Sequence, residues 1–326
     1  MDWLMQPDTT IEKFLVMLFA IALFALVMAA VLVLVDRPSL PRWVAAGGYL
    51  GPALPPIVMG RHNPAFRTIR NSLYNNSLSE FVGLENYVTI FTQDLFLTVL
   101  RNTFLWVLLV PLLSTALGLV YAVLVDRTRF EKFAKTLIFL PMAISMVGAS
   151  IIWKFVYEYK AKGVPQTGLL NQILVWMGLE PQQFLLNAPI NTFYLIIVMV
   201  WIQTGFAMTV LSAAIKAIPD ETIEAANVDG ATGMRLFWQI TVPSVRSAII
   251  VVLTTIAMAT RKAVDSVRTM TGGQFDTSIV ANEFYTQTFG RQAQGIGAAL
   301  AVLLFVLVMP LIVYNVRQMR ISEGER

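Results

Sequence analysis

The chain has 326 residues, of which 56% are hydrophobic and 13% are charged, and its formal net charge is +4. Soluble domains carry roughly 25% charged residues, so this composition predicts an integral membrane protein and not an enzyme of the soluble type. The sequence has no cysteine and a single histidine, which excludes disulfides and thiolate metal sites and leaves little material for a Ser-His-Asp triad. We therefore expect no metal site and no catalytic residues, and the modest charge gives no reason to expect a nucleic-acid partner.

Long apolar segments predict seven membrane-spanning helices, because about 20 apolar residues are needed to cross a bilayer. In chain order these segments are 14–35, 43–60, 102–125, 136–157, 191–215, 248–260 and 295–316. The first is too long for a cleavable signal peptide, so we expect it to be retained as an anchor. The second is short, and its three prolines should bend it. The polar stretch 65–101 is expected to be an extended loop with partial helix.

The segment from Pro219 to Pro243 is the longest soluble-looking run late in the sequence, and its pattern predicts two short helices with a bend between them. Pro219 suits the first turn of a helix, and Gly230 can adopt the left-handed conformation that ends one. Thr232 is placed to cap the second helix, and Pro243 to limit it. Two sets of side chains fit this prediction, the acidic Asp220, Glu221 and Glu224 near the first helix start and the apolar Leu236, Phe237 and Ile240 on the second helix.

Six residues of this segment have the spacing of the EAA loop, the signature of ABC import permeases: Glu224, Ala225, Ala226, Gly230, Ile240 and Pro243. The motif runs as EAA, three residues, Gly, nine residues and Ile-x-Leu-Pro, and Val242 replaces the usual leucine. An ordinary interfacial helix hairpin is the alternative explanation. The resemblance implies that these residues, together with Asp229, form the coupling helix that docks into a groove on the ATPase subunit.

The resemblance extends over roughly residues 45 to 320. The third core helix of carbohydrate import permeases is similar to segments 140–145, 148–150 and 153–155 of this chain. The fifth-helix exit of the alpha-glucoside branch is similar to segments 269–273 and 281–285. The resemblance implies an all-α integral membrane protein with the type I ABC importer permease fold. That fold would have six core transmembrane helices plus one extra N-terminal helix.

The resemblance implies several partners. They are a second permease subunit, a dimer of ATPase subunits, an extracellular solute-binding protein, the lipid bilayer and a sugar substrate, an alpha-glucoside or related oligosaccharide. This chain contains no Gly-Lys pair and so no Walker A loop, and ATP is therefore expected to be used by the partner ATPase subunits, with no cofactor on this chain. Three alternatives remain, namely a secondary transporter driven by an ion gradient, an ABC permease for a non-sugar solute, and a membrane scaffold.

We expect the chain to lie in the cell (inner) membrane and to cross it several times. If the EAA segment is cytoplasmic, alternation of the spans places the N-terminus outside and the C-terminus in the cytoplasm. The segments then cytoplasmic are 36–42, 126–135, 216–247 and 317–326. They hold 12 Lys or Arg in 59 residues, against 10 in the 105 residues of the outside loops 61–101, 158–189 and 261–292, so the charge density supports this orientation. The predicted domains are 1–42, the extra helix and a short cytoplasmic link; 43–320, the permease transmembrane domain with the coupling loop 219–243; and 321–326, a cytoplasmic tail.

Polar residues inside or beside the apolar spans are candidates for the substrate pathway, because such residues are costly in a membrane. The candidates are Gln203, Thr204, Lys262, Asp265, Asn282 and Tyr285. Lys262 and Asp265 are three residues apart and Arg261 is four from Asp265, so an ion-pair cluster at the membrane edge is an equally good explanation. For the other four, interhelical hydrogen bonds are the alternative. The sequence departs from the family pattern at 61–63 and around Arg261, which leaves open what the pathway accepts.

Overall fold

The computed structural model describes residues 9–35, 64–126 and 128–324. Within these ranges the regular secondary structure is helical, apart from an isolated β-bridge between Tyr74 and Phe81. The prediction of an all-α chain is confirmed for this part of the protein. The chain divides into two compact units, residues 1–67 and 68–326, and each is described by itself.

The first unit contains α1, which runs from Thr10 to Val35. Thr9 and Glu12 cap its start reciprocally, because the Glu12 amide donates to Thr9 Oγ1 at 3.3 Å and the Thr9 amide donates to a Glu12 carboxylate oxygen at 3.2 Å. Large apolar side chains are exposed along α1 from Ile11 to Met28, and the length and composition of Thr10–Ala30 suit a membrane span. The predicted second span, 43–60, lies outside the described residues, as do residues 61–63.

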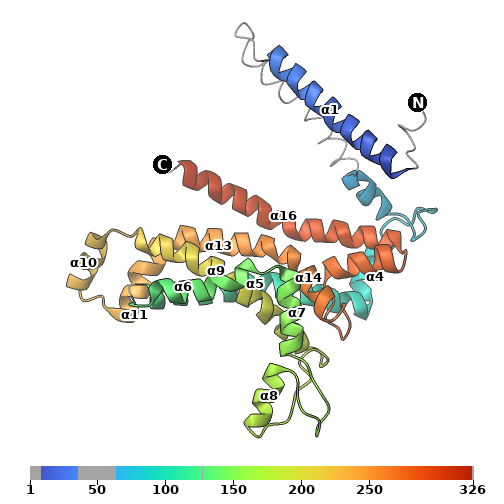
Figure 1. The fold of residues 1–326 in the computed structure, drawn as a ribbon. Helices are drawn as coiled ribbons and strands as arrows, with labels where there is room; N and C mark the ends of the chain where they lie inside the picture. The colour runs from blue at the N-terminus through green and yellow to red at the C-terminus, as the bar shows by residue number, and fades with distance from the viewer. Residues whose placement is uncertain (1–8, 36–63, 127, 325–326) are drawn as a thin grey trace. The chain divides into compact units, whose positions relative to one another are not determined.

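The second unit contains a body of long helices and several short ones (Figure 1). In chain order these are α4 (Glu85–Thr92), α5 (Asp94–Val125), α6 (Glu131–Phe139), η2 (Leu140–Ala143), α7 (Met146–Val156), α8 (Leu169–Trp176), α9 (Asn191–Lys216), α10 (Asp220–Val228), α11 (Gly233–Leu236), η3 (Phe237–Thr241), α12 (Val242–Ser244), α13 (Arg246–Ala259), η4 (Thr260–Lys262), α14 (Ala263–Met270), α15 (Val280–Tyr285), η5 (Thr286–Gly290) and α16 (Gln294–Gly324). η2 and η4 are 3-10 turns, whereas η3 and η5 are π-helical. In Figure 1, α10 and α11 lie at one end of the body, and α8 stands out from it beyond α7.

Three segments of the second unit are each long and apolar enough to cross a membrane: α5, α9 and the α13–α14 segment Arg246–Met270. The segments Glu131–Ala143 and Met146–Val156 pass the same test together, as a pair bent by 102°. The apolar part of α16, Gln294–Pro310, is shorter. These helices fall on the apolar segments that the sequence predicts, whereas the total of six core helices plus one stays a prediction.

The start of α5 differs from the prediction. The sequence predicts a loop with partial helix over residues 65–101 and a span from residue 102, but the long helix α5 begins at Asp94. Phe96 and Val99 explain the difference, because both are buried on one side of the first two turns and pack in a cluster that includes Leu300 of α16. The polar character of this segment comes from side chains on its exposed side, which do not oppose a helix.

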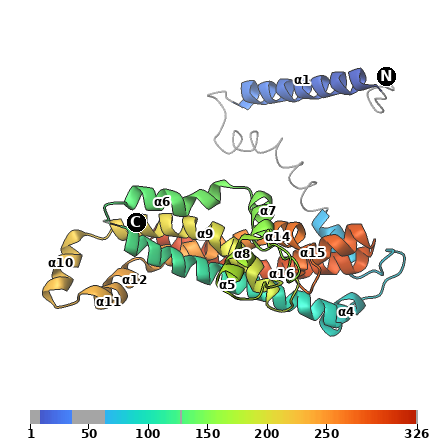
Figure 2. The same ribbon diagram turned by 60° about the horizontal axis from the view of Figure 1, so that its bottom comes forward.

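The packing of α5 against α9, with α6 alongside, forms the centre of the second unit (Figure 2). Gly118 of α5 permits this close approach, because a Cβ here would lie 2.5 Å from the Ala207 Cβ and 2.7 Å from the Met208 backbone nitrogen of α9. Gly205 has the same role toward α6, where a Cβ would lie 2.6 Å from the Ile138 carbonyl oxygen. Small residues at such contacts let membrane helices pack backbone to backbone. The three helices are therefore held at a separation that tolerates no added side chain.

A second contact links α7 to α14. The hydroxyls of Ser150 and Ser266 lie 2.9 Å apart, and both side chains are fully buried. Ser145 begins α7 by accepting a hydrogen bond from the Gly148 amide at 3.1 Å, which satisfies one free donor of the helix start. The bend before α7 therefore delivers this helix to α14, the segment that carries Asp265.

Gly118→Val tests the close packing of α5 and α9. The valine side chain has no space beside Ala207 and Met208, so we expect a loss of about 1–3 kcal/mol of stability from overpacking. The measurement is the thermal unfolding of the detergent-purified protein. Ala116→Val, on the exposed side of the same helix, is the matched control. Equal melting temperatures for the two variants would contradict the packing described here.

Candidate functional site

The predicted coupling loop is a bent pair of helices whose bend is at Gly230. α10 runs from Asp220 to Val228 with Pro219 at its N-cap, one residue earlier than the first-turn position that the sequence suggests. Gly230 has φ +81°, the left-handed conformation that the sequence predicts. The Gly230 amide donates to the Asn227 carbonyl at 3.1 Å, and the Ala231 amide donates to the Ala226 carbonyl at 2.9 Å. These two bonds form a Schellman motif, so the backbone itself sets the angle of the bend.

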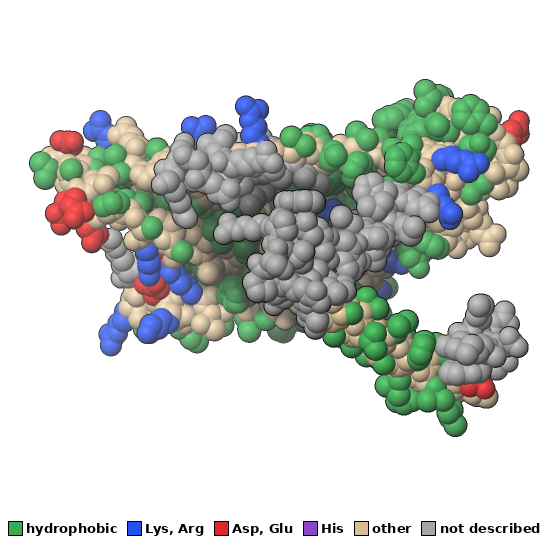
Figure 3. Space-filling model, turned by 90° about the horizontal axis from the view of Figure 1, so that it is seen from above, with side chains coloured by type: hydrophobic (Ala, Val, Ile, Leu, Met, Phe, Trp, Pro, Cys, Tyr) green, Lys and Arg blue, Asp and Glu red, His purple; other side chains and the backbone are tan. Residues whose placement is uncertain are grey.

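The EAA residues divide between the surface and the interior of this bend. Glu224 and Ala225 are exposed, whereas Ala226 and Ala231 are buried at the end of α10. Ala226 therefore supports the bend, and Glu224 and Ala225 are available to a partner. Figure 3 shows acidic side chains gathered at the end of the molecule where Figure 1 places α10. Apolar side chains are also exposed on this loop, namely Val228, Met234 and Trp238.

In the second half of the loop, the structure differs from the prediction in two details. Thr232 precedes α11 with extended backbone angles, but its side chain makes no capping hydrogen bond. Pro243 does not end the helix, because the chain passes through the π-helical η3 and continues as α12 to Ser244. A proline in a regular α-helix removes one hydrogen bond and clashes with the carbonyl four residues earlier. The wider π turn before Pro243 accommodates this, and the Ser244 hydroxyl donates to the Ile240 carbonyl at 2.7 Å.

The polar segment of the fifth predicted core span lies at a break between α13 and α14. η4 contains Arg261 and Lys262, both exposed, and Asp265 in the first turn of α14 is half-buried. The described residues contain no ion pair between Asp265 and either cation, so the predicted pairing is not found. Arg261 instead donates from Nε to the Met258 carbonyl at 3.1 Å. Asp265 therefore makes no ion pair within the described residues, although it shares one side of the α13–α14 segment with Arg261 and Arg268.

Tyr285 lies close to this segment. The Arg268 guanidinium is 3.7 Å from the centre of the Tyr285 ring, a cation–π contact that joins α14 to α15. Tyr285 also packs against Phe289, with ring centres 4.9 Å apart. The structure thus brings Tyr285 and the Asp265 helix together, as the hypothesis of a shared pathway requires.

Two candidate pathway residues, Thr204 and Gln203, lie on α9 and have different surroundings. Thr204 is buried, and its hydroxyl donates to the Val200 carbonyl at 2.7 Å within the same helix, so the expected interhelical hydrogen bond is not found. Thr204 also lines an apolar groove between α5, α6 and α9, beside Leu117 and Trp201. Gln203 is half-buried and makes no side-chain hydrogen bond within the part of the chain that the structure describes.

Asn282 is a supporting residue of the turn between α14 and α15. It is buried, and its Nδ2 donates to the Ser278 hydroxyl at 3.0 Å. A Cβ at Gly273 would lie 2.2 Å from Asn282 Nδ2, so the turn is folded directly onto this side chain. The buried Glu283 accepts from Ser278 at 3.1 Å and from Gln287 at 2.8 Å. Asn282 is therefore enclosed by its own turn and offers little surface to a substrate.

Sequence reasoning missed the anchors of this turn. Asn102 of α5 donates to the carbonyls of Asp276 and Ser278 at 2.6 and 3.1 Å. Asn191 at the start of α9 donates to the Phe275 carbonyl at 2.6 Å. Both asparagines are fully buried. Their position at the first residue of a predicted apolar span is a signal that could have identified them as anchors.

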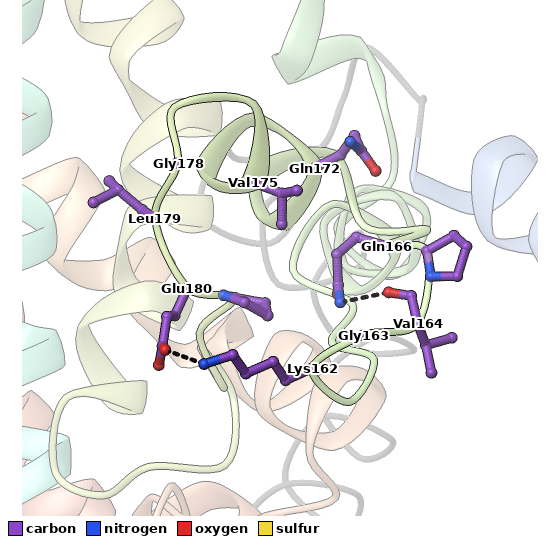
Figure 4. A pocket seen from close by; sticks show the side chains of 11 residues that line it. Lys162, Gly163, Val164, Gln166, Gln172, Val175, Gly178, Leu179 and Glu180 are labelled. Carbon is purple, nitrogen blue, oxygen red and sulfur yellow. Dashed lines mark hydrogen bonds and ion pairs between the residues drawn. The ribbon is translucent and has the colours of Figure 1, made fainter.

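A further hollow lies on the segment between α7 and α9, around α8 (Figure 4). Its volume is about 660 Å³, and Lys162, Gln166 and Glu180 are among its lining residues. Lys162 and Glu180 form an ion pair at 2.5 Å, and the hydrogen bond from Lys162 holds the pKa of Glu180 below its usual value. Both side chains are exposed to solvent, so this pair contributes little to stability.

Comparison with known proteins gives these features a context. Residues 114–320 match the family described as "Binding-protein-dependent transport system inner membrane component". The osmoprotective compounds uptake permease protein GgtC of Synechocystis sp. is 44% identical over 263 residues, which is 81% of this chain and 94% of that protein. The alpha-glucoside transport system permease protein AglF of Rhizobium meliloti is 44% identical over 277 residues, 85% of this chain and 82% of that protein.

Solved structures show the same fold. A bacterial alginate ABC transporter in complex with an alginate pentasaccharide-bound periplasmic protein contains a chain with a TM-score of 0.69 and 21% sequence identity, which covers 84% of this chain and 92% of that one. At this identity the likeness concerns the fold alone. The family match, the two relatives and the EAA spacing in the exposed α10 agree with one another. The chain belongs to the binding-protein-dependent transport system inner membrane components, the permease subunits of ABC importers.

Proposed function

We propose that this chain forms half of the translocation pathway of a sugar importer for an alpha-glucoside or related oligosaccharide. The observation that carries the coupling part of the proposal is the exposed α10 with its EAA spacing, held at a set angle by the Schellman motif at Gly230. The sugar part is supported by the 44% identity to the alpha-glucoside permease AglF. The chain itself carries out no chemical reaction, and ATP is hydrolysed by partner subunits.

The coupling surface has the character of a docking site. Glu224 and Ala225 face outward on α10, and Ala225 allows a partner surface to approach closely because its side chain is small. Apolar side chains beside them add area that association with an ATPase subunit would bury. Closure of two ATPase subunits on ATP would then displace α10 and switch the pathway between outward and inward access.

The exposed charges of η4 and α14 support a position for the pathway. A cation in the hydrocarbon core costs about 2.5–3.5 kcal/mol on insertion scales unless it faces water or protein. Arg261 and Lys262 are exposed on this chain, so their side of the segment faces a second permease subunit or the aqueous path between the two subunits. Asp265 and Tyr285 carry oxygen atoms that can form hydrogen bonds with the hydroxyl groups of a sugar.

The proposed assembly contains a second permease, two ATPase subunits and an extracellular solute-binding protein. A neighbouring fold occurs in a transporter solved with a periplasmic protein that holds an alginate pentasaccharide, which supports a binding-protein partner here. The proposed orientation has the N-terminus outside, with α10 and the C-terminus in the cytoplasm. A second candidate substrate class is osmoprotective compounds, because GgtC is as similar to this chain as AglF is.

The decisive experiment is purification of the intact complex, reconstitution into vesicles, and a panel of alpha-glucosides, other oligosaccharides and osmoprotective compounds. We expect ATP hydrolysis that rises with a sugar-loaded binding protein, and uptake that needs ATP and persists with an uncoupler. Uptake that continues without ATP and stops with an uncoupler would support an ion-driven transporter instead. Stimulation by osmoprotective compounds alone would select the second candidate.

Gly230→Val tests the coupling loop. A side chain at φ +81° adds roughly 1–2 kcal/mol of strain and alters the bend that positions Glu224. We expect normal membrane insertion but weaker retention of the ATPase subunits or loss of sugar-stimulated hydrolysis. Gly178→Val is the matched control, because Gly178 has φ +76° and, like Gly230, has no neighbouring atom within 4 Å of an added Cβ. Wild-type hydrolysis and uptake in the Gly230→Val variant would show that α10 is not the coupling element.

A cysteine at Phe130 tests the orientation, because the natural chain contains no cysteine to interfere. Phe130 is exposed and lies in the loop that we place in the cytoplasm. We expect no labelling by an impermeant thiol reagent in intact cells and full labelling after the membrane is opened. Trp176→Cys, exposed on α8 in a predicted outside loop, is the control that should react in intact cells. The opposite pattern would reverse the orientation.

Asp265→Asn tests the pathway. A hydrogen bond to a charged group contributes about 1.5–3 kcal/mol, so loss of this carboxylate should raise the sugar concentration for half-maximal uptake about tenfold or more. The amount of assembled complex should not change, because Asp265 makes no ion pair within the described residues. Asp276→Asn, an exposed aspartate of the following turn, is the control and should transport normally. Unchanged uptake in Asp265→Asn would place the pathway elsewhere.

A further inference from the structure

Four charged side chains and a serine meet where α5 ends, α6 begins and α9 ends. Asp126 is the C-cap residue of α5, Glu131 and Lys135 belong to α6, and Ser212 and Lys216 lie in the last two turns of α9. We call this set the basal network. It has two carboxylates and two ammonium groups, so its net charge is zero. It lies immediately before the coupling loop, because α10 begins at Asp220.

Asp126 is the centre of the basal network. Its side chain is 7% exposed, and it forms an ion pair with Lys135 and a longer one with Lys216 at 3.9 Å. The Ser212 hydroxyl lies 2.8 and 3.0 Å from the two Asp126 carboxylate oxygens, and the Lys135 Nζ lies 2.5 Å from the Ser212 hydroxyl oxygen. A single buried carboxylate thus holds groups from α6 and α9 at the end of α5.

Glu131 completes the basal network. It pairs with Lys135 of its own helix at 2.9 Å and with Lys216 of α9. Lys216 is the last residue of α9, so its ammonium group ties the point where the chain leaves the bundle to the first turn of α6. Each of the two lysines therefore contacts both carboxylates, and no member of the set has only one partner.

The backbones of the same three helices are already in contact above the basal network. Gly118 places α5 directly against Ala207 and Met208 of α9, and Gly205 places α9 against Ile138 of α6. A bundle that is closely packed along its length and cross-linked at its end has little freedom to shear at that end. The three helices are therefore in contact both at their ends and along their length.

We propose that the basal network is a permanent clamp that makes α5, α6 and α9 move as one piece with the coupling helix α10. This inference rests on the proposed function, in which an ATPase subunit displaces α10. Without the clamp, a force that α10 transmits to the end of α9 would shift that end against α5 and α6 and leave the rest of the bundle in place. With it, the displacement passes into α6 and through the bend at Ile144–Ser145 into α7, which contacts α14 through Ser150 and Ser266.

A clamp that stays closed is favoured over a latch that opens in each cycle. Separation of α9 from α5 would take the Ser212 hydroxyl and the Lys216 ammonium group away from the Asp126 carboxylate, so a latch would have to break these contacts in every cycle. Separation would also have to pull apart the glycine contacts. The ion pair between Lys162 and Glu180, on the segment around α8, differs from the basal network because both of its side chains are exposed to solvent.

The first test removes one charged group of the basal network, chosen so that the fold should stay intact. Lys216 is half exposed, so Lys216→Met keeps the apolar stem and deletes only the charge. We expect wild-type amounts of assembled complex but about threefold fewer sugar molecules taken up per ATP hydrolysed, the effect of losing one partly exposed ion pair. Lys216→Arg should restore the ratio. Lys132→Met, an exposed lysine of α6 that forms no ion pair in the described residues, is the matched control. An unchanged ratio in Lys216→Met would overturn the clamp.

The second test decides between a clamp and a latch. Glu131→Cys with Lys216→Cys gives a unique thiol pair in a chain that has no other cysteine. We expect the reduced double variant to be uncoupled, and a short thiol-to-thiol crosslinker to restore uptake per ATP. Loss of uptake on crosslinking, with hydrolysis retained, would show that the basal network must open and would overturn the proposal. If the wild-type complex itself shows no ATP-dependent uptake, the proposed function fails independently of the clamp.

Discussion

Backbone N–H and C=O groups inside a bilayer have no water to bind, so each must find a partner within the protein. This constraint explains both the helical spans and the places where they break. At the bend before α7, Ser145 accepts from the Gly148 amide. At the break between α13 and α14, Thr260 donates to the Ala257 carbonyl at 2.6 Å and Arg261 donates to the Met258 carbonyl. At these two interruptions side chains replace lost backbone bonds, so irregular structure can exist inside the helical body.

The same constraint separates the charged residues into two kinds. The basal network pairs its charges with one another, so the Asp126 carboxylate can be nearly buried where three helices meet. Arg261 and Lys262 have exposed side chains, and they need a surface other than lipid beside them. The first arrangement holds three helices of this chain together. In the proposed importer, a second permease subunit or water would cover the surface that carries the second arrangement.

The sequence allowed good prediction of the elements whose cause is local. Gly230 was predictable as the bend because a left-handed position favours glycine, and the long spans were predictable from their apolar length. Contacts between distant segments were not predictable in this way. Asn102 and Asn191 anchor a turn more than 80 residues away, and Thr204 satisfies its hydroxyl within its own helix. The pairing proposed for Asp265 was wrong within the described residues, because sequence spacing places charges on one helix side without deciding their rotamers.

The π-helical segment Phe237–Thr241 has a consequence for how this loop can vary in length. A π turn is an α-helix that holds one residue more than its regular register allows. Each residue of an α-helix rotates the chain by about 100°, so a residue inserted in a regular α-helix would turn the chain beyond it through roughly that angle. The π turn instead absorbs the additional residue in one wider turn, so the helix on its two sides keeps nearly the same orientation. The π segment therefore fixes how many residues fit between Gly230 and Pro243 without rotating the chain on either side, and this number can be constrained even where the identities of the residues in between are free to change.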